Sequence, residues 1–396
     1  MSSRAGVANW GFIIMLGCAS ALSAFGMASV VPALPSLGRT LGVDSSQQQF
    51  LVSSYLLGLG VFQPMQGLLC DRFGRRPVLL AGFAVFIGGS LAAARTHSLL
   101  ALCAARVLQS LGVSVATVVS RAIVRDTHEG EAAGTALSFI SAVMGIAPII
   151  APLAGGVIVD AAGWQAVFLM HAFIGSALLL WMTLGLRETR PTSTRAMNMR
   201  QLLQGFGVLL RERRFLAFAL TYGFLSGGSF IFITVGADIF ARQFGMSAAR
   251  FGLFWATLAA SYTVGAASSG WASRRVSAER VVKIGARLSV VGALAILGTG
   301  LLSSPSLAAW GTALSLFIFA CGLTSPLALA SAVSQHAELA GVASGLSSAL
   351  AMLLSMVCAV AAGVVYHGDP TPNDVLIVGC ALATWYCARL AYPKAA

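Results

Sequence analysis

Long apolar runs recur along the whole chain of 396 residues, separated by short polar connections. Most of them reach the roughly 20 residues that an α-helix needs to cross a bilayer. The runs are continuous rather than alternating, which excludes the pattern of a transmembrane β-barrel. The pattern therefore predicts an all-α polytopic membrane protein with twelve transmembrane helices, at residues 8–31, 47–69, 78–94, 99–120, 132–159, 164–186, 215–237, 251–273, 281–302, 307–331, 339–366 and 374–392.

The longest polar connection, residues 187–214, divides the predicted spans into two sets of six. We expect an N-terminal six-helix bundle at 1–186, a cytoplasmic linker at 187–214 and a C-terminal six-helix bundle at 215–396. Corresponding connections in the two halves share glycine and arginine at one constant offset, which suggests a duplicated unit. Duplicated bundles are typical of secondary transporters, in which two repeats move around a central site.

Basic residues exceed acidic ones by 25 to 13, and the net charge is +12. The arginines occupy the connections rather than a stripe with interleaved aromatic residues, so we expect no nucleic-acid partner. Most lie on the side of the termini and the linker, which the positive-inside rule assigns to the cytoplasm. The first run has no small-residue cleavage site, so we expect it to be the first transmembrane span rather than a cleaved signal peptide. We expect a multi-pass protein of the bacterial inner membrane, with both termini cytoplasmic.

The most highly charged short connection joins the second and third predicted spans. Its sequence is Gly67-Leu-Leu-Cys-Asp71-Arg72-Phe-Gly74-Arg75-Arg76-Pro77. We predict a tight loop at the membrane surface, turned by Gly74 and stopped by Pro77. The stretch resembles the signature that the major facilitator superfamily carries in this loop.

Further motifs resemble those of the drug:proton antiporters in that superfamily, and of the bicyclomycin-resistance type in particular. They are Pro32-Ala-Leu-Pro35, Arg106-Val-Leu-Gln109-Ser-Leu-Gly112, Arg121-Ala-Ile-Val-Arg125-Asp126 and Ala147-Pro148-Ile-Ile-Ala151-Pro152-Leu-Ala-Gly155-Gly156. The resemblance implies two six-helix bundles around a cavity lined by spans 1, 4, 7 and 10, with spans 2, 5, 8 and 11 as gates. It also implies secondary active transport driven by a proton gradient, without a bound cofactor or metal.

The charged connection is a candidate conformational latch, formed by residues whose contacts exist in one transport state only. We expect Asp71 to pair with a cation at the end of span four, or with the N-terminus of span eleven. The alternative is a cluster of positive charges that only fixes topology. The residues assigned to the latch are Gly67, Asp71, Arg72, Gly74, Arg75, Arg76, Arg121 and Arg125.

Two sets of residues inside the spans are candidates for the transport pathway and its gate. Arg106 lies too deep in span four for a surface position, and Gln109 is one turn further on. A structural role in bonding backbone carbonyls is the alternative for Arg106. Aromatic side chains on spans two, seven and eight could build an apolar substrate site or serve packing alone, and we assign Tyr55 and Tyr222 to the pathway. The set Pro148, Pro152, Gly155 and Gly156 predicts a bent gate helix, or simply close packing.

The sequence departs from the family pattern at the residue expected to carry the proton. Many relatives place an acid near position 28, where this chain has Ala28. The remaining candidates are Asp160, Asp238 and His171, of which we favour Asp238 because span seven should line the cavity. The two acids could also be solvated helix ends, and His171 a packing residue.

The missing first-span acid also bears on the substrate. Arg106 is the one strong charge on a lining span, and a cationic substrate would face it unfavourably in a low dielectric. We therefore expect a monomeric, proton-coupled exporter of a small amphipathic compound, neutral to anionic, such as a drug or a siderophore. An uptake permease on the same fold is the alternative. The five histidines show no ligand spacing and there is no GxxxxGK[ST] motif, which argues against an enzyme or an ATP-driven pump.

Overall fold

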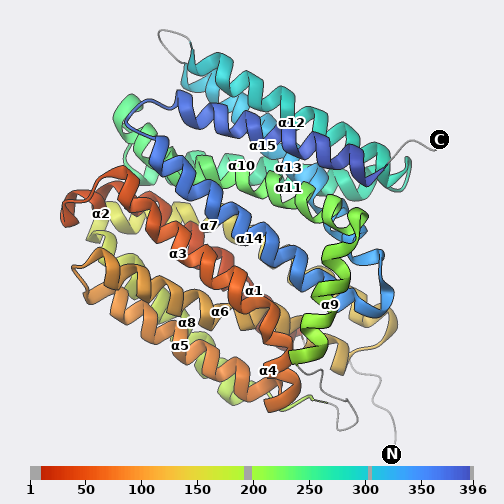
Figure 1. Ribbon diagram of the computed structural model, residues 1–396. Coiled ribbons are helices and arrows are strands. Elements are labelled where there is room, and N and C mark those ends of the chain that lie inside the picture. Colours follow the sequence, from red (N-terminus) through yellow and green to blue (C-terminus); the bar gives the residue numbers. More distant parts are fainter. Residues whose placement is uncertain (1–9, 191–198, 302–305, 393–396) are drawn as a thin grey trace, which may run out of the picture.

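The computed structural model describes residues 10–190, 199–301 and 306–392, and these are almost entirely helical (Figure 1). The first half has a broken first span and a broken second span, followed by four long helices. Its elements are α1 (Trp10–Ala28), η1 (Val31–Ala33), α2 (Leu34–Leu41), α3 (Ser45–Phe62), η2 (Gln63–Met65), α4 (Gln66–Phe73), α5 (Arg75–Arg95), α6 (Leu99–Thr127), α7 (Gly130–Ala162) and α8 (Trp164–Gly185).

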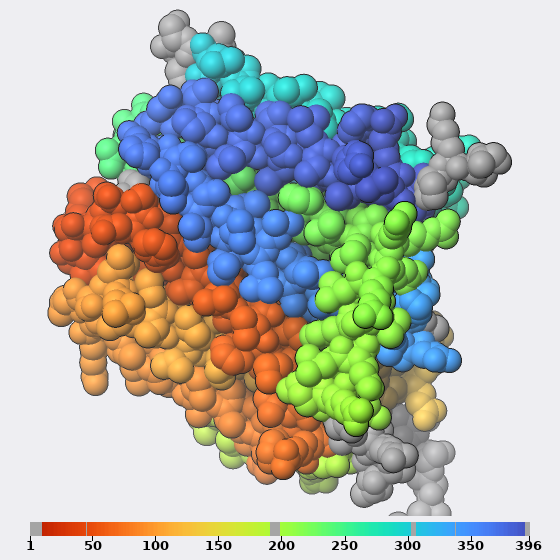
Figure 2. Space-filling model, viewed as in Figure 1, coloured from red at the N-terminus to blue at the C-terminus, as the bar shows by residue number. Residues whose placement is uncertain are grey.

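The second half consists of six long helices preceded by a short one. They are α9 (Met199–Arg211), α10 (Arg213–Phe244), α11 (Ala248–Ala272), α12 (Ala278–Gly300), α13 (Leu307–Ser334), the short η3 (Ala337–Leu339), α14 (Ala340–Val365) and α15 (Thr371–Ala391). Each half packs mainly within itself, and the two halves meet where α3 lies on α14 and α7 lies on α11. The space-filling view shows α14 in close contact with α3 along this boundary (Figure 2).

The long helices run roughly parallel and antiparallel, so the molecule has two ends. We call the end where α1 begins, α15 ends and α9 lies the linker side, and the opposite end the far side (Figure 1). The all-α polytopic architecture predicted from the sequence is confirmed, and the predicted spans coincide with the observed helices to within seven residues at each end.

Ten helical segments of the described chain are long and apolar enough to cross a membrane. The remaining two predicted spans correspond to α3 with α4 and to α11. Both are helical as expected but more polar, with three consecutive glutamines starting at Gln47 near the start of α3. These are helices that lie between the two halves, where part of their surface is shielded from lipid.

The predicted tight turn at Gly74 is present, and it is shorter than expected. The helix α4 continues to Phe73 and α5 begins at Arg75, leaving Gly74 alone between them. Pro77 does not stop a helix but lies in the first turn of α5, where proline is tolerated.

The predicted linker also contains a helix that the sequence pattern did not reveal. Residues 191–198 of the linker lie outside the described residues, and α9 follows them. Leu202 and Leu209 bury one face of α9 against α10 and α14, while its arginines remain exposed. This alternation is typical of an amphipathic helix at a membrane surface.

Candidate functional site

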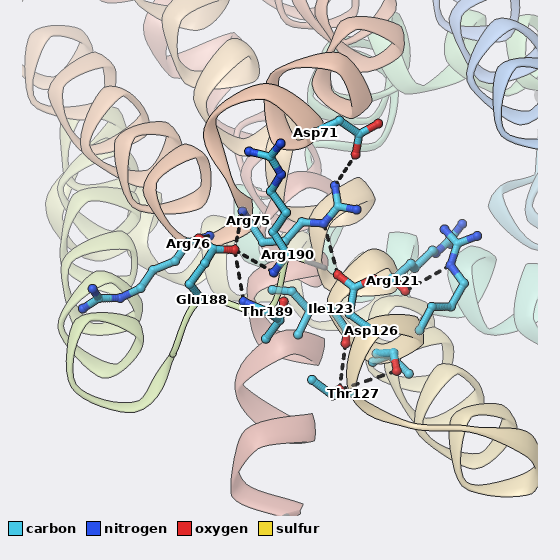
Figure 3. A network of polar contacts seen from close by, with 12 residues as sticks. Asp71, Arg75, Arg76, Arg121, Ile123, Asp126, Thr127, Glu188, Thr189 and Arg190 are labelled. Atoms are coloured by element: carbon cyan, nitrogen blue, oxygen red, sulfur yellow. Dashed lines mark hydrogen bonds and ion pairs between the residues drawn. The ribbon is translucent and has the colours of Figure 1, made fainter. Parts of the chain in front are cut away.

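The charged residues of the linker side form a connected network that ties together α4, α5 and α6 (Figure 3). Asp71 Oδ1 accepts a hydrogen bond from Arg75 Nη1 at 2.8 Å, and Asp126 Oδ2 accepts one from Arg75 Nε at 3.2 Å. The Arg75 side chain is buried between the two carboxylates. A cation held by two acids from different helices fixes the positions of the helix ends relative to one another.

Glu188, which follows α8, completes this network at the start of α5. Its carboxylate accepts hydrogen bonds from the backbone N–H groups of Arg75 at 2.9 Å and Arg76 at 3.1 Å. The N–H groups of Thr189 and Arg190 bind the same carboxylate. A helix N-terminus has unpaired N–H groups and a positive dipole end, so an anion here is stabilising. Glu188 was not among the residues predicted from the sequence, because its pairing depends on α8 ending beside α5.

Gly74 is required at the turn for two reasons. Its φ of +98° is a conformation that residues with a side chain rarely adopt. A Cβ on Gly74 would also lie 2.6 Å from Glu188 Oε2. The turn, the acid and the helix start therefore form one unit. Gly67, by contrast, has free space around it in this structure.

The structure corrects the expected partner of Asp71. The acid pairs with Arg75, one helical turn away, and not with Arg121 or Arg125. Arg125 donates instead to the carbonyl of Arg121. The physical reason is that the single-residue turn at Gly74 lets α4 and α5 place Asp71 and Arg75 within direct reach.

The other two arginines of the motif also bind within the first half. The Arg72 carbonyl accepts a hydrogen bond from Arg190, and the Arg72 guanidinium lies 5.3 Å from the ring centre of Phe73. Arg76 donates to the carbonyl of Thr183 near the end of α8. The motif therefore holds the linker-side ends of α4, α5, α6 and α8 together.

The contacts of Glu188 predict a pH-dependent stability. Partial burial opposes ionisation, but the four backbone N–H groups outweigh it and lower the Glu188 pKa. A lowered folded-state pKa gives stability that is present above the unfolded value of about 4.3 and is lost as pH falls through the folded-state pKa. We expect Glu188→Gln to lower Tm by about 1–3 °C at pH 7 and by less at acidic pH.

This prediction is checked by thermal unfolding of the detergent-solubilised protein at several pH values. The matched control is Glu338→Gln, which changes an exposed acid that accepts no hydrogen bond from the described residues. An equal Tm loss at every pH, or an equal loss in the control, would contradict the assignment.

A second polar cluster lies inside the first half and centres on Arg106, which is 1% exposed. Its guanidinium donates to the carbonyl oxygen of Gly26 in α1 at 3.0 Å and to that of Leu51 in α3 at 3.4 Å. A third bond reaches Gln109 Oε1 at 3.0 Å. The ring centre of Tyr55 lies 4.1 Å from the guanidinium carbon, a cation–π distance. Arg106 thus joins α1, α3 and α6.

The hydrogen bonds of the cluster continue through Gln109 to His171 and fix the donors and acceptors. Gln109 Nε2 donates to Ser90 Oγ at 2.7 Å and faces His171 Nδ1 at 3.4 Å, so Nδ1 acts as acceptor. Ser29 Oγ donates to the carbonyl of Phe25, and His171 Nε2 lies 2.7 Å from the same oxygen, so Nε2 carries the proton. This assignment makes His171 neutral.

The cluster therefore carries one positive charge, that of Arg106, and contains no carboxylate. It brings together Arg106, Gln109 and Tyr55, three of the residues assigned to the transport pathway, and it also contains His171 and two serines. Tyr222 is not part of it. Tyr222 lies on α10 within electrostatic reach of Arg121 and Tyr262, in a separate group between the halves.

The gate motif lies in the far-side half of α7, where both prolines are inside the helix. A Cβ on Gly155 would lie 2.0 Å from the carbonyl oxygen of Ser29, next to α1. A Cβ on Gly156 would lie 2.3 Å from the carbonyl oxygen of Ala248, at the start of α11. The two glycines allow α7 to touch the backbone of both neighbours.

A third glycine, in the second half, allows the same close contact between α7 and α11. A Cβ on Gly252 of α11 would lie 2.3 Å from the carbonyl oxygen of Pro152. Asp160, at the end of α7, also accepts a hydrogen bond from the N–H of Ala249 at 3.0 Å. We call Gly156, Gly252 and this hydrogen bond the far-side seal.

Asp238 lies near the far-side end of α10 and is 8% exposed. Its Oδ2 is 2.7 Å from Arg242 Nε, one turn further along the helix. Tyr366, which follows α14, is a further neighbour. The pair is adjacent to a pocket that residues of both halves line, among them Asp44 and His367. Asp238 is thus a buried acid close to the boundary between the halves.

These features define a polytopic helical membrane protein whose two six-helix halves meet along glycine-rich contacts, the architecture of a secondary transporter. A sequence profile for the Major Facilitator Superfamily matches residues 16–359, and the chain belongs to this family. It is a transporter of small molecules and not an enzyme.

Individual relatives support the same assignment. The chain is 26% identical over 338 residues to the bicyclomycin resistance protein homolog of Haemophilus influenzae, covering 85% of this chain and 84% of that protein. It is 29% identical over 297 residues to the multidrug transporter MdfA of Edwardsiella ictaluri, covering 75% and 72%. The predicted resemblance to drug:proton antiporters is confirmed.

Solved structures agree on the fold. The crystal structure of a D-xylose–proton symporter superposes with a TM-score of 0.77 at 15% identity, covering 95% of this chain and 97% of that one. At this identity the similarity concerns the fold alone.

Proposed function

We propose that this protein is a proton-coupled exporter of small amphipathic compounds, neutral to anionic in charge, that works by alternating access in the bacterial inner membrane. The linker side would face the cytoplasm, because the arginines of α9 and of the latch lie there. A single chain contains both halves and so suffices as a monomer.

The observation that carries the substrate class is the charge of the Arg106 cluster. A buried guanidinium has its hydrogen bonds satisfied by carbonyl and amide oxygens, and no acid of the cluster offsets its charge. In a low dielectric this field repels a cation and attracts an anion or the negative end of a neutral dipole. Two relatives, a bicyclomycin resistance protein homolog and a multidrug transporter, have names that agree with a drug-sized compound. Amphenicol-like drugs, bicyclomycin-like compounds and hydroxamate siderophores have suitable chemistry.

The far-side seal supports the alternating-access part of the proposal. Backbone contacts between α7 and α11 close the boundary of the halves at this side. Transport in the proposed direction requires this seal to open while the linker side closes. The latch residues would then exchange contacts, which makes the Asp71–Arg75 pair a component of one state.

Asp238 supports the proton-coupling part. It is a buried acid on α10 that forms an ion pair with Arg242, one turn further along the helix, close to the boundary between the halves. Asp160 is exposed and bonds the start of α11, which suits a structural role in the seal rather than a proton carrier. His171 is a proton acceptor only if its bond from Gln109 breaks.

The direct test is drug and siderophore accumulation in bacterial cells that lack their own pumps, with and without a protonophore. Expression of the protein should lower accumulation, and the protonophore should restore it. Protonophore-insensitive efflux would contradict proton coupling. Raised accumulation on expression would favour the uptake permease, and transport in oriented vesicles would confirm that direction.

For the latch, we expect Asp71→Asn to lower transport about fivefold or more while expression stays near that of the unaltered protein. Asparagine keeps an acceptor for Arg75 but removes the charge, so the two conformational states change in relative population. The readouts are the transport rate and the amount of folded protein in the membrane. The control is Glu131→Gln, a change to an exposed acid on the same side without an ion pair to a described residue. Unchanged transport in Asp71→Asn would contradict the role of these residues as a conformational latch.

A further inference from the structure

A basic pocket of about 320 Å³ lies between α12 and α15 at the linker side of the second half. Lys283 and Arg287 reach it from α12, and Trp385 and Arg389 reach it from α15. Tyr392, just after α15, completes the lining. Neither helix lies at the main boundary between the two halves, so the pocket is separate from the proposed transport pathway.

The shape of the pocket follows from small residues at its base. Ala286 and Ala388 are both buried and belong to a small apolar cluster that joins α12 to α15. The short alanine side chains leave a hollow above them, and the long side chains of the basic residues surround it. The pocket is therefore formed by the packing of two helices rather than by a loop.

The charges of the pocket are only partly neutralised. Lys283 forms an ion pair with Glu279 and donates to the carbonyl oxygen of Tyr392. Arg287 and Arg389 are exposed and form no ion pair or hydrogen bond with the described residues. The Arg389 guanidinium lies 4.3 Å from the ring centre of Trp385, which restrains its position. Two unneutralised guanidinium groups thus face one pocket.

The position of the pocket matches the depth of lipid headgroups. Arg287 lies about 14 Å along the axis from the start of α12, and Lys283 about 8 Å. The hydrocarbon core is about 30 Å thick within a bilayer of about 40–45 Å, so these side chains can extend to the headgroup layer. Farther from the linker side, α12 exposes Val291 and Leu294, apolar side chains suited to acyl chains.

We propose that this pocket binds the phosphodiester headgroup of an anionic membrane phospholipid. Arg287 and Arg389 donate to the phosphate oxygens, since guanidinium groups match phosphate geometry. Lys283 adds a third positive charge, and Trp385 packs at the level of the headgroup. The acyl chains lie on the exposed apolar surface of α12.

The test is native mass spectrometry of the full-length protein in detergent, titrated separately with phosphatidylglycerol and phosphatidylcholine. We expect the unaltered protein to bind phosphatidylglycerol preferentially. The double variant Arg287→Gln with Arg389→Gln should bind it roughly thirtyfold more weakly, as expected for the loss of two arginines at a lipid surface. Equal binding of the two lipids by the unaltered protein would overturn the proposal.

The matched control is Arg274→Gln with Arg275→Gln. It removes the same charge from the same side, and it includes an arginine 4.1 Å from the ring centre of Trp271, but it leaves the pocket intact. Equal weakening in both double variants would show a general charge effect and overturn the site. Monodisperse elution in size-exclusion chromatography shows that both double variants are folded. If a double variant does not fold, one of its two single substitutions is measured in its place.

A third measurement distinguishes a lipid ligand from a soluble phosphate compound. Glycerol 3-phosphate carries the phosphate without acyl chains and should not compete at concentrations that saturate the lipid. Full competition would identify a soluble ligand instead of a lipid. None of these measurements depends on transport, so the outcome is independent of the proposed substrate and direction.

Discussion

Arg106→Gln is expected to lower transport of a neutral or anionic substrate by roughly 10- to 100-fold, the range for a lost charge-assisted hydrogen bond. Glutamine can still donate to the carbonyl of Gly26, but it removes the one charge of the cluster. The same variant should be more sensitive to competition by a quaternary ammonium dye, because the repulsion of cations is gone.

Transport in vesicles and dye competition measure this effect, and Arg106→Lys is the charge-preserving comparison. Lysine keeps the positive charge but lacks the planar fork that serves three acceptors, so we expect partial transport and no gain in dye sensitivity. Full transport by Arg106→Gln would show that Arg106 only holds α1, α3 and α6 together.

Gly156→Ala is expected to reduce transport at least tenfold by preventing closure of the far side. The added Cβ would lie 2.3 Å from a backbone carbonyl of α11, and backbone cannot rotate away as a flexible side chain can. The helices must separate, and the clash raises the free energy of the closed seal. Overpacking of this kind costs about 1–3 kcal/mol, enough to change state populations by one or two orders of magnitude.

The matched control for this prediction is Gly145→Ala on the same helix. A Cβ there meets no atom within 4 Å, so transport should be unchanged and α7 slightly more stable. The distance between spin labels at Ser46 and His367 reports far-side closure directly. It should lengthen in Gly156→Ala and stay constant in Gly145→Ala. Equal distances in both variants would contradict the seal.

The helices could be predicted well from the sequence because the hydropathy of each segment depends only on the residues of that segment. Span positions and the division at the linker all depend on such local signals. The helix α9 was missed because its arginines mask its apolar face in a simple count. The breaks after Ala28 and Phe62 were likewise invisible, since the apolar runs continue through them.

The site was predicted by residue type but not by partner. Asp71, Arg75 and Gly74 were assigned to one motif, whereas Glu188 lies 113 positions from Arg75 and has no motif of its own. Only the packing of α8 beside α5 brings them together. For Arg106 the depth in the span predicted a special role, but hydropathy could not indicate which carbonyls would bind it.

The far-side seal consists largely of places where a side chain is missing. Such a contact tolerates almost no replacement at Gly156 or Gly252, yet it places no demand on the chemistry of the residues that meet the cargo. Mutational freedom should therefore be distributed unevenly along α7 and α11. New specificities can arise around a seal that remains unchanged, which is one physical route by which a single scaffold acquires many different cargoes.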